Sequence, residues 1–313
     1  MKSIRISSPA RKSAKTLLGI ALAASTGCST GPDPRTPERI ATIQDATMQL
    51  WIETPNGAGM GSAVALSPQH LITCRHGWPA KDELISEIRL RNVRWDENII
   101  TIYEVMTEEG SKRWPIPGLP FTAEAVLQGT GKVIPASHEV GEDQTHDLET
   151  FLKDCIPDWI VLECDDVPAA RTPFTPLPIG EPRPGKTALI GGYTFDERSY
   201  DEGTRDLRSG AAPEFRLSWA EIEEVTDDGA IIMHLKSNNQ EPLPGMSGGP
   251  IFMIDGEELL LVGINLADFE TTWNDLITLE KIAIGRRIPI EVMEELNLSV
   301  STNSNSGVEI NDQ

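Results

Sequence analysis

Cysteine, basic residues and long hydrophobic runs are all scarce in this sequence of 313 residues. Four cysteines are too few for a disulfide-built protein of this length, and no apolar run approaches the roughly 20 residues of a membrane-spanning helix. Lys and Arg number 27 against 48 Asp and Glu, which gives a formal net charge of −21. Because a chain this acidic repels the phosphate backbone of nucleic acids, we expect no nucleic-acid partner.

Apolar residues make up 39% of the chain and charged residues 24%, which is typical of a globular protein. The length is sufficient for one large domain or two modest ones. The sequence has no metal-ligand cluster, phosphate-binding loop or internal repeat, so we predict no metal and no cofactor.

The first 28 residues have the pattern of a secretory signal, in which basic residues precede a short apolar run at 17–24. The residues before Cys28 resemble the lipobox of bacterial lipoproteins, in which the cysteine is lipidated after cleavage. Ordinary cleavage after a small-x-small site such as Ala21-Leu22-Ala23 is the alternative. We therefore expect export to the periplasm or cell envelope, with membrane attachment through Cys28 in the first case, and a flexible tether over 29–44.

The remaining chain contains many short apolar runs separated by Gly, Pro, Asn and Asp, which predicts an all-β barrel or sandwich. Six prolines in 166–185 indicate a stiff connector between a first lobe at 45–165 and a second at 186–298. A C-terminal helix is expected from Pro289 to Leu296, and the polar tail 299–313 is expected to be disordered. Strands are expected at 47–53, 61–67, 71–73, 159–164, 187–191, 230–235, 250–254, 259–264 and 281–284, and a weaker helix at 148–153.

Three segments carry residues suited to catalysis. His76 follows the apolar run Leu71–Thr73, Asp158 opens an almost wholly apolar strand, and Ser247 lies in the glycine-rich segment Gly245–Pro250. Each is ordinary by itself, since a single histidine, a strand-flanking acid and a glycine-flanked serine are common in structural roles.

The order of these residues along the chain is more informative than any one of them. Serine needs a base to take its proton, and that base needs a buried carboxylate to fix its tautomer. Gly-x-Ser-x-Gly also occurs in α/β hydrolases, but their histidine follows the serine, and no histidine follows Ser247 here. An esterase of that type is therefore excluded.

Taken together, these segments resemble those of trypsin-like serine peptidases of bacterial type. Gly59–Val64 resembles the Gly-x-Gly-Ser strand of that family, Thr73–His76 its Thr-x-x-His motif, and Gly245–Pro250 its nucleophile loop. Val262–Asn265 and Gly285–Pro289 resemble late segments of Deg-type proteases.

This resemblance implies a chymotrypsin-type fold of two six-stranded antiparallel barrels, to which the sequence adds a C-terminal helix. It also implies roles for the candidate residues. Ser247 attacks the peptide carbonyl, His76 is the general base, Asp158 orients His76, and the N–H groups of Gly245 and Ser247 form the oxyanion hole.

The sequence departs from the family at several places. Met246 replaces an Asp that is common before the serine, and 82 positions separate His76 from Asp158, which predicts an insertion within 96–150. Asp147 and Asp154 are alternative acids. Cys74, Cys155 and Cys164 are expected to be free thiols, although a bond between Cys74 and Cys155 is conceivable.

The prediction for specificity rests on two acids, Glu241 and Asp268, at family positions near the primary specificity pocket. Two carboxylates there would favour Lys or Arg in the substrate, while the alternative is that both are solvated loop residues. The function that we expect is an exported serine endopeptidase acting on polypeptides. The alternative is a non-catalytic trypsin-like envelope protein that serves as a binding module.

Overall fold

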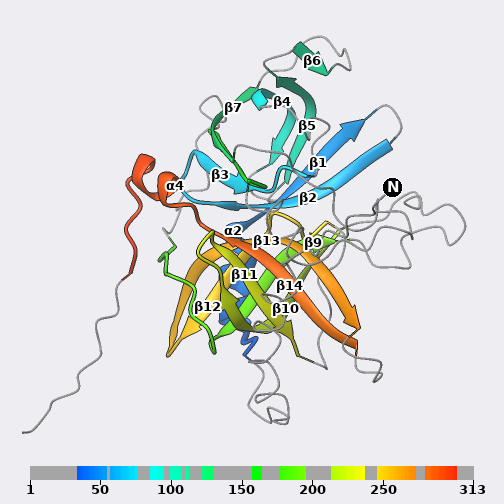
Figure 1. Ribbon diagram of the computed structural model, residues 1–313. Helices are drawn as coiled ribbons and strands as arrows, with labels where there is room; N and C mark the ends of the chain where they lie inside the picture. Colours follow the sequence, from blue (N-terminus) through cyan, green and yellow to red (C-terminus); the bar gives the residue numbers. More distant parts are fainter. Residues whose placement is uncertain are drawn as a thin grey trace, which may run out of the picture. The chain divides into compact units, whose positions relative to one another are not determined.

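A computed structural model describes the fold of the chain (Figure 1). The chain divides into two units, Met1–Pro34 and Arg35–Gln313, and the fold below is that of the second unit. The signal segment and Cys28 lie outside the described residues, as do most of the connector and the tail. The described residues are 34–54, 57–76, 85–94, 99–107, 110–112, 121–129, 157–163, 177–194, 213–236, 245–272 and 279–301.

The second lobe is a closed barrel of six strands in the order β10-β11-β14-β13-β12-β9 (Figure 1). Its interior holds an apolar cluster that includes Ile190, Ile231, Met246 and Ile251. This barrel agrees with the predicted architecture of the second lobe. Its strands are β9 (Thr187–Thr194), β10 (Glu214–Val225), β11 (Ala230–Leu235), β12 (Pro250–Asp255), β13 (Glu258–Thr272) and β14 (Leu279–Arg287).

The first lobe is an eight-stranded sheet in the order β1-β2-β3-β8-β7-β4-β5-β6, in which β1 also pairs in parallel with β5. The all-β, chymotrypsin-like fold is thus confirmed, but this lobe has eight strands where six were expected. Part of the predicted insertion at 96–150 forms β5, β6 and β7, which belong to the sheet. The strands are β1 (Thr47–Thr54), β2 (Gly57–Ala65), β3 (His70–Thr73), β4 (Ile85–Arg94), β5 (Ile99–Thr107), β6 (Gly110–Lys112), β7 (Phe121–Gln128) and β8 (Ile160–Glu163).

Helix α2 (Pro37–Ala46) corrects the prediction of a tether over 29–44. The Thr36 side chain accepts a hydrogen bond from the Arg39 N–H at 3.4 Å, and proline stands in the first turn, so the segment has a standard helix start. Ile43 is fully buried, which anchors the helix in the apolar core. Residues 37–44 of the predicted tether are therefore folded.

The C-terminal region agrees with the predicted helix, because α4 covers Ile290–Glu295 and buries Val292 and Met293. The described ends of the connector and the tail meet each other. Ile179 forms isolated bridges with Leu261 and Val300, and the Ser301 N–H donates to the Ile179 carbonyl at 2.7 Å. The start of the tail at 299–301 is therefore ordered against the barrel rather than disordered.

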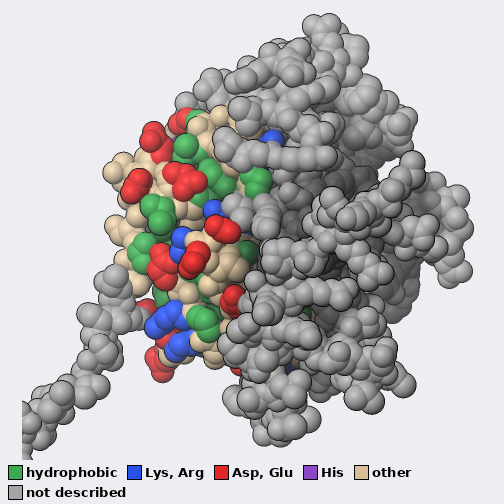
Figure 2. Space-filling model, viewed as in Figure 1, with side chains coloured by type: hydrophobic (Ala, Val, Ile, Leu, Met, Phe, Trp, Pro, Cys, Tyr) green, Lys and Arg blue, Asp and Glu red, His purple; other side chains and the backbone are tan. Residues whose placement is uncertain are grey.

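The surface agrees with the acidic composition. Figure 2 shows Asp and Glu side chains spread over the described part of one face, with apolar side chains between them. In the described part of the chain, no helix is long and apolar enough to cross a membrane.

Candidate active site

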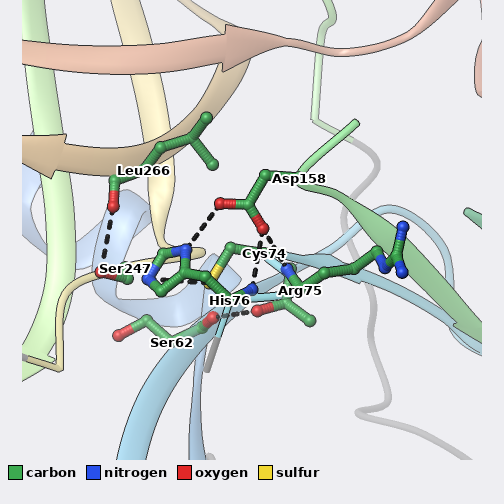
Figure 3. Close-up of polar contacts among 8 residues, drawn as sticks. Ser62, Cys74, Arg75, His76, Asp158, Ser247 and Leu266 are labelled. Carbon is green, nitrogen blue, oxygen red and sulfur yellow. Dashed lines mark hydrogen bonds and ion pairs between the residues drawn. The ribbon is translucent and has the colours of Figure 1, made fainter. Parts of the chain in front are cut away.

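His76 and Asp158 are brought together by the pairing of two short strands. Strands β3 and β8 are antiparallel, with Thr73 opposite Ile160, so the end of one strand lies beside the start of the other. His76 follows β3 by three residues and Asp158 precedes β8 by two. The His76 Nδ1 atom lies 2.6 Å from Asp158 Oδ2 (Figure 3).

The Asp158 carboxylate is held by hydrogen bonds from the segment that carries the histidine. Its Oδ1 atom accepts the backbone N–H groups of Arg75 at 2.6 Å and of His76 at 2.8 Å, and the residue is 1% exposed. A carboxylate fixed in this way accepts the Nδ1 proton of the ring. The second ring nitrogen, Nε2, then carries no proton and has the lone pair that can accept one from a nucleophile.

Ser247 lies in a tight turn between Gly245, with φ of 97°, and Gly248, with φ of 82°. Both values lie in the left-handed region that favours glycine. A Cβ atom at Gly248 would overlap the Thr73 side chain and the Ser62 carbonyl, and would lie 2.9 Å from the Cys74 nitrogen. The serine turn therefore packs directly against the strand end that leads to His76.

The Ser247 hydroxyl and the His76 ring are directed to other partners in this state. The hydroxyl donates to the Leu266 carbonyl at 3.2 Å, and His76 Nε2 lies 3.8 Å from Cys74 Sγ (Figure 3). A serine proton acceptor must come within about 2.6–3.2 Å, although catalytic hydrogen bonds are often longer without substrate. Ser247 must therefore turn away from Leu266 before His76 can accept its proton.

Ser62 on β2 connects the turn to the rest of the fold. Its hydroxyl donates to the Gly245 carbonyl at 2.8 Å and accepts the Tyr193 N–H at 2.9 Å. Its backbone N–H donates to the Ser247 carbonyl at 2.9 Å, and its own carbonyl accepts the Thr73 hydroxyl at 2.6 Å. Because Ser62 is fully buried, it fixes the peptide groups on both sides of the serine turn.

These contacts leave two backbone donors near the nucleophile. Among the described residues, none accepts a hydrogen bond from the N–H of Gly245 or of Ser247. The Ser62 hydroxyl donates to the Gly245 carbonyl, which fixes the orientation of the peptide group between Gly245 and Met246. The two N–H groups predicted for the oxyanion hole are thus available for a ligand oxygen.

The environment of His76 raises its pKa well above the ordinary value of 6.5. Burial alone would lower the pKa, but the Cys74 sulfur and the Asp158 carboxylate outweigh burial by favouring the protonated ring. The imidazolium that forms when His76 takes a proton is therefore stabilised in place.

Cys74 is buried and forms no disulfide bond, as the sequence predicts, whereas Cys155 and Cys164 lie outside the described residues. Glu241 lies outside the described residues. Asp268 is on β13, where its backbone pairs with Ala283, and nothing is described of its side chain. The prediction about the specificity pocket therefore stays a prediction. The described residues hold no group of three or more His, Cys, Asp and Glu that could bind a metal ion.

The structure adds residues that the sequence did not single out. Ser62 was part of the quoted Gly-x-Gly-Ser motif, but the motif does not reveal its hydrogen bonds. Leu266 supplies the carbonyl that holds the Ser247 hydroxyl. Arg75, 1% exposed, donates from its guanidinium to the Gly129 carbonyl, which ties the histidine segment to the end of β7.

No protein-family model and no curated protein matches this chain. Among solved structures it is similar to a serine endoprotease from Yersinia pestis, with 16% identity, a TM-score of 0.39, and coverage of 85% of this chain and 66% of that one. Neuropsin, a serine protease expressed in the limbic system of mouse brain, has 12% identity, a TM-score of 0.43 and coverage of 80% and 93%. A Glu endopeptidase has 12% identity, a TM-score of 0.39 and coverage of 84% and 93%.

The matching structures include a bacterial and a mouse protease, so they do not single out a bacterial type. Identities and TM-scores this low say nothing about the activity of the chain. Its chemistry has to be judged from its own site.

Proposed function

We propose that this protein is a serine endopeptidase in which Ser247 is the nucleophile, His76 the general base and Asp158 the residue that orients His76. The observation that carries the proposal is the 2.6 Å contact between His76 Nδ1 and the buried Asp158 carboxylate, next to a glycine turn that carries Ser247. Arrangements of this kind activate a hydroxyl that is otherwise a poor nucleophile at neutral pH.

The proposed reaction starts when the Ser247 hydroxyl turns from Leu266 to His76. Its oxygen bonds to the peptide carbonyl carbon while its proton passes to His76 Nε2, and the carbonyl oxygen becomes an oxyanion held by the N–H groups of Gly245 and Ser247. His76 then gives the proton to the leaving amine as the C–N bond breaks, which leaves an acyl-enzyme. Water attacks the acyl group by the same route and restores the serine.

A non-catalytic binding module is the second candidate, and one observation favours it. The Ser247 hydroxyl bonds to Leu266 and His76 Nε2 faces Cys74, so the two reacting atoms are not paired in this state. In a binding module this arrangement would be permanent. In a peptidase it is a resting state that a substrate converts.

Labelling with a fluorophosphonate probe separates the two candidates. We expect the purified protein to be labelled at Ser247 and to cleave peptides from a mixed library, and Ser247→Ala to lose both properties while it unfolds at the same temperature. A folded wild-type protein that takes up no label and cleaves no peptide would refute the peptidase and leave the binding module.

Two finer predictions belong with this function. Export, with lipid attachment at Cys28, is proposed from the leader sequence alone. A preference for Lys or Arg follows from the sequence positions of Glu241 and Asp268 only if both acids line the pocket; if they are solvated loop residues, they set no preference. No described side chain bears on either.

A further inference from the structure

Asn265 on β13 is a buried amide that the proposed mechanism does not use. The residue is 2% exposed, and its Oδ1 atom is buried without a hydrogen-bond partner among the described residues. Leaving a buried acceptor unpaired is costly, so most such groups in folded proteins have a partner. An unpaired amide in this position therefore needs an explanation.

The backbone of Asn265 is attached to the nucleophile turn on both sides. Its carbonyl accepts the Gly248 N–H at 2.7 Å, and its N–H donates to the Gly249 carbonyl at 2.8 Å. The next residue, Leu266, holds the Ser247 hydroxyl. Strand β13 is thus bonded to both residues that follow the serine, so a substrate held at Ser247 lies beside this part of β13.

The side chain of Asn265 points to the inside of the barrel. Residues 263 and 265 share one face of β13, because the strand is regular between them. A Cβ atom at Gly263 would lie 2.9 Å from the Ile231 side chain, and one at Gly285, opposite Asn265, would overlap Ile251. Ile231 and Ile251 belong to the barrel interior, so the amide lies against apolar surroundings.

We propose that Asn265 recognises the substrate side chain on the amino side of the cleaved bond, and that it selects a neutral amide, Gln or Asn, at that position. The proposal rests on the peptidase function above. An amide in the substrate supplies an N–H for the Asn265 oxygen and an oxygen for its NH2, so the pair is complementary whichever way the Asn265 amide is turned.

A neutral partner fits this site better than a charged one. The apolar cluster of the barrel interior, with Met246, Met253 and Ala283, offers no opposite charge among its described members. A Lys or Arg side chain would have to lose its hydration there against a neutral carbonyl, which is unfavourable. A purely apolar side chain would leave the Asn265 oxygen unpaired, which sites that are built around a hydrogen bond reject strongly.

The test compares peptides that differ only in the residue before the cleaved bond, with the full chain as enzyme. We expect kcat/KM for Gln to exceed that for Met, which has a similar length, by about 100-fold or more. Asn265→Leu should bring this ratio close to one. Ser218→Ala, which changes an equally buried residue on β10, should leave the ratio as in the wild type.

Unfolding temperature provides a readout without substrate. If the amide is kept for the ligand, Asn265→Leu removes an unpaired polar group from apolar surroundings, and the protein should unfold at the same or a higher temperature. A lower unfolding temperature would mean that Asn265 has a structural role and would overturn the proposal. So would a ratio of Gln to Met that Asn265→Leu leaves unchanged.

Failure of this proposal can be distinguished from failure of the proposed function. A wild-type protein that is labelled at Ser247 and cleaves after Arg, but not after Gln, keeps the peptidase and rejects the role of Asn265. It would favour Glu241 and Asp268 instead. A wild-type protein with neither labelling nor cleavage rejects the peptidase itself.

Discussion

Ser62→Ala tests how far the nucleophile turn depends on one buried hydroxyl. The change removes the donor to the Gly245 carbonyl and the acceptor of the Tyr193 N–H. Each backbone group that is left unpaired costs about 1–3 kcal/mol, so we expect a loss of roughly 2–5 kcal/mol in the free energy of unfolding. For a domain of this size that corresponds to a fall of roughly 5–15 °C in the unfolding temperature.

The same change should slow catalysis more than it weakens substrate binding. The Ser62 hydroxyl fixes the peptide group between Gly245 and Met246, which lies between the two peptide groups that carry the Gly245 and Ser247 N–H donors. Without this hydroxyl the middle group can rotate, the dihedral angles of Gly245 and Met246 change with it, and the two donors lose their alignment. Loss of one such donor costs on the order of 100-fold or more in kcat. We therefore expect kcat to fall by about that factor, with KM changed little, for a peptide that the wild type cleaves.

The assay measures kcat, KM and the unfolding temperature of the wild type, Ser62→Ala and Ser218→Ala. Ser218 is buried to the same degree on β10, so it controls for the loss of any buried serine hydroxyl. If Ser62→Ala is destabilised but keeps the kcat of the wild type, Ser62 supports the fold without orienting the oxyanion hole. If neither property changes, the hydrogen bonds of Ser62 do not matter for this turn.

Three further predictions concern other parts of the chain. Because the pKa of His76 is raised and only the neutral ring accepts a proton, kcat/KM should fall to half its maximum on the acid side above pH 6.5; a midpoint at or below 6.5 contradicts this. Gly248→Ala should abolish labelling of Ser247, because its Cβ would overlap Thr73, whereas Gly256→Ala, also at positive φ but in open space, should keep it; equal labelling of both variants would show that the turn tolerates a side chain. If Cys28 is lipidated, cells given a labelled fatty acid should label the wild type and not Cys28→Ala, while a wholly soluble wild type with its N-terminus near Ala24 would indicate ordinary signal cleavage.

Strands that are apolar on both faces were the easiest to predict. Strand β11 has the predicted bounds, Ala230–Leu235, because its first four residues are all buried and form an unbroken apolar run. Strands β12 (Pro250–Asp255) and β8 (Ile160–Glu163) are similar, and their predicted bounds differ from the observed ones by one residue or less at every end. In such segments the apolar run in the sequence coincides with the stretch of strand that is buried in the fold.

Strands with one polar face were missed, because their pattern is interrupted by charges. Strand β10 (Glu214–Val225) alternates between buried and more exposed residues over only part of its length and contains a bulge between Ile222 and Glu224. Strands β5 and β7 lie in a stretch that the spacing of His76 and Asp158 marked as an insertion. Their place in the sheet is decided by pairing with β1, β4 and β8, which sequence spacing does not reveal.

The residues of the candidate site could be predicted from the sequence, but the hydrogen bonds and contacts between them could not. The order of His76, Asp158 and Ser247 led to the site, since each residue type has a defined chemical role. The contact of Cys74 with His76 and the unpaired amide of Asn265 depend on where chains far apart in sequence meet. From the sequence we asked only whether Cys74 forms a disulfide bond, and the sequence did not reveal that its sulfur helps to raise the pKa of His76.

Arg75 is a buried residue that links the two segments on which His76 and Asp158 lie. Its guanidinium donates to the Gly129 carbonyl, and the Gly129 N–H donates to the Trp159 carbonyl at 2.9 Å, next to Asp158. Gly129 also packs so closely on the Pro157 carbonyl that a Cβ atom would overlap it. The arginine thus ties the segment that carries the histidine to the segment that carries the aspartate.

In Figure 3 the Arg75 side chain runs away from the His76 ring, so its effect on catalysis has to pass through the backbone. Arg75→Met keeps the length of the side chain but leaves the Gly129 carbonyl unpaired, which costs about 1–3 kcal/mol. We expect a lower unfolding temperature and a smaller kcat, and partial recovery of both in Arg75→Lys, whose ammonium group can still donate to Gly129. An unfolding temperature that stays at the wild-type value in Arg75→Met would show that this buried arginine does not hold the two segments together.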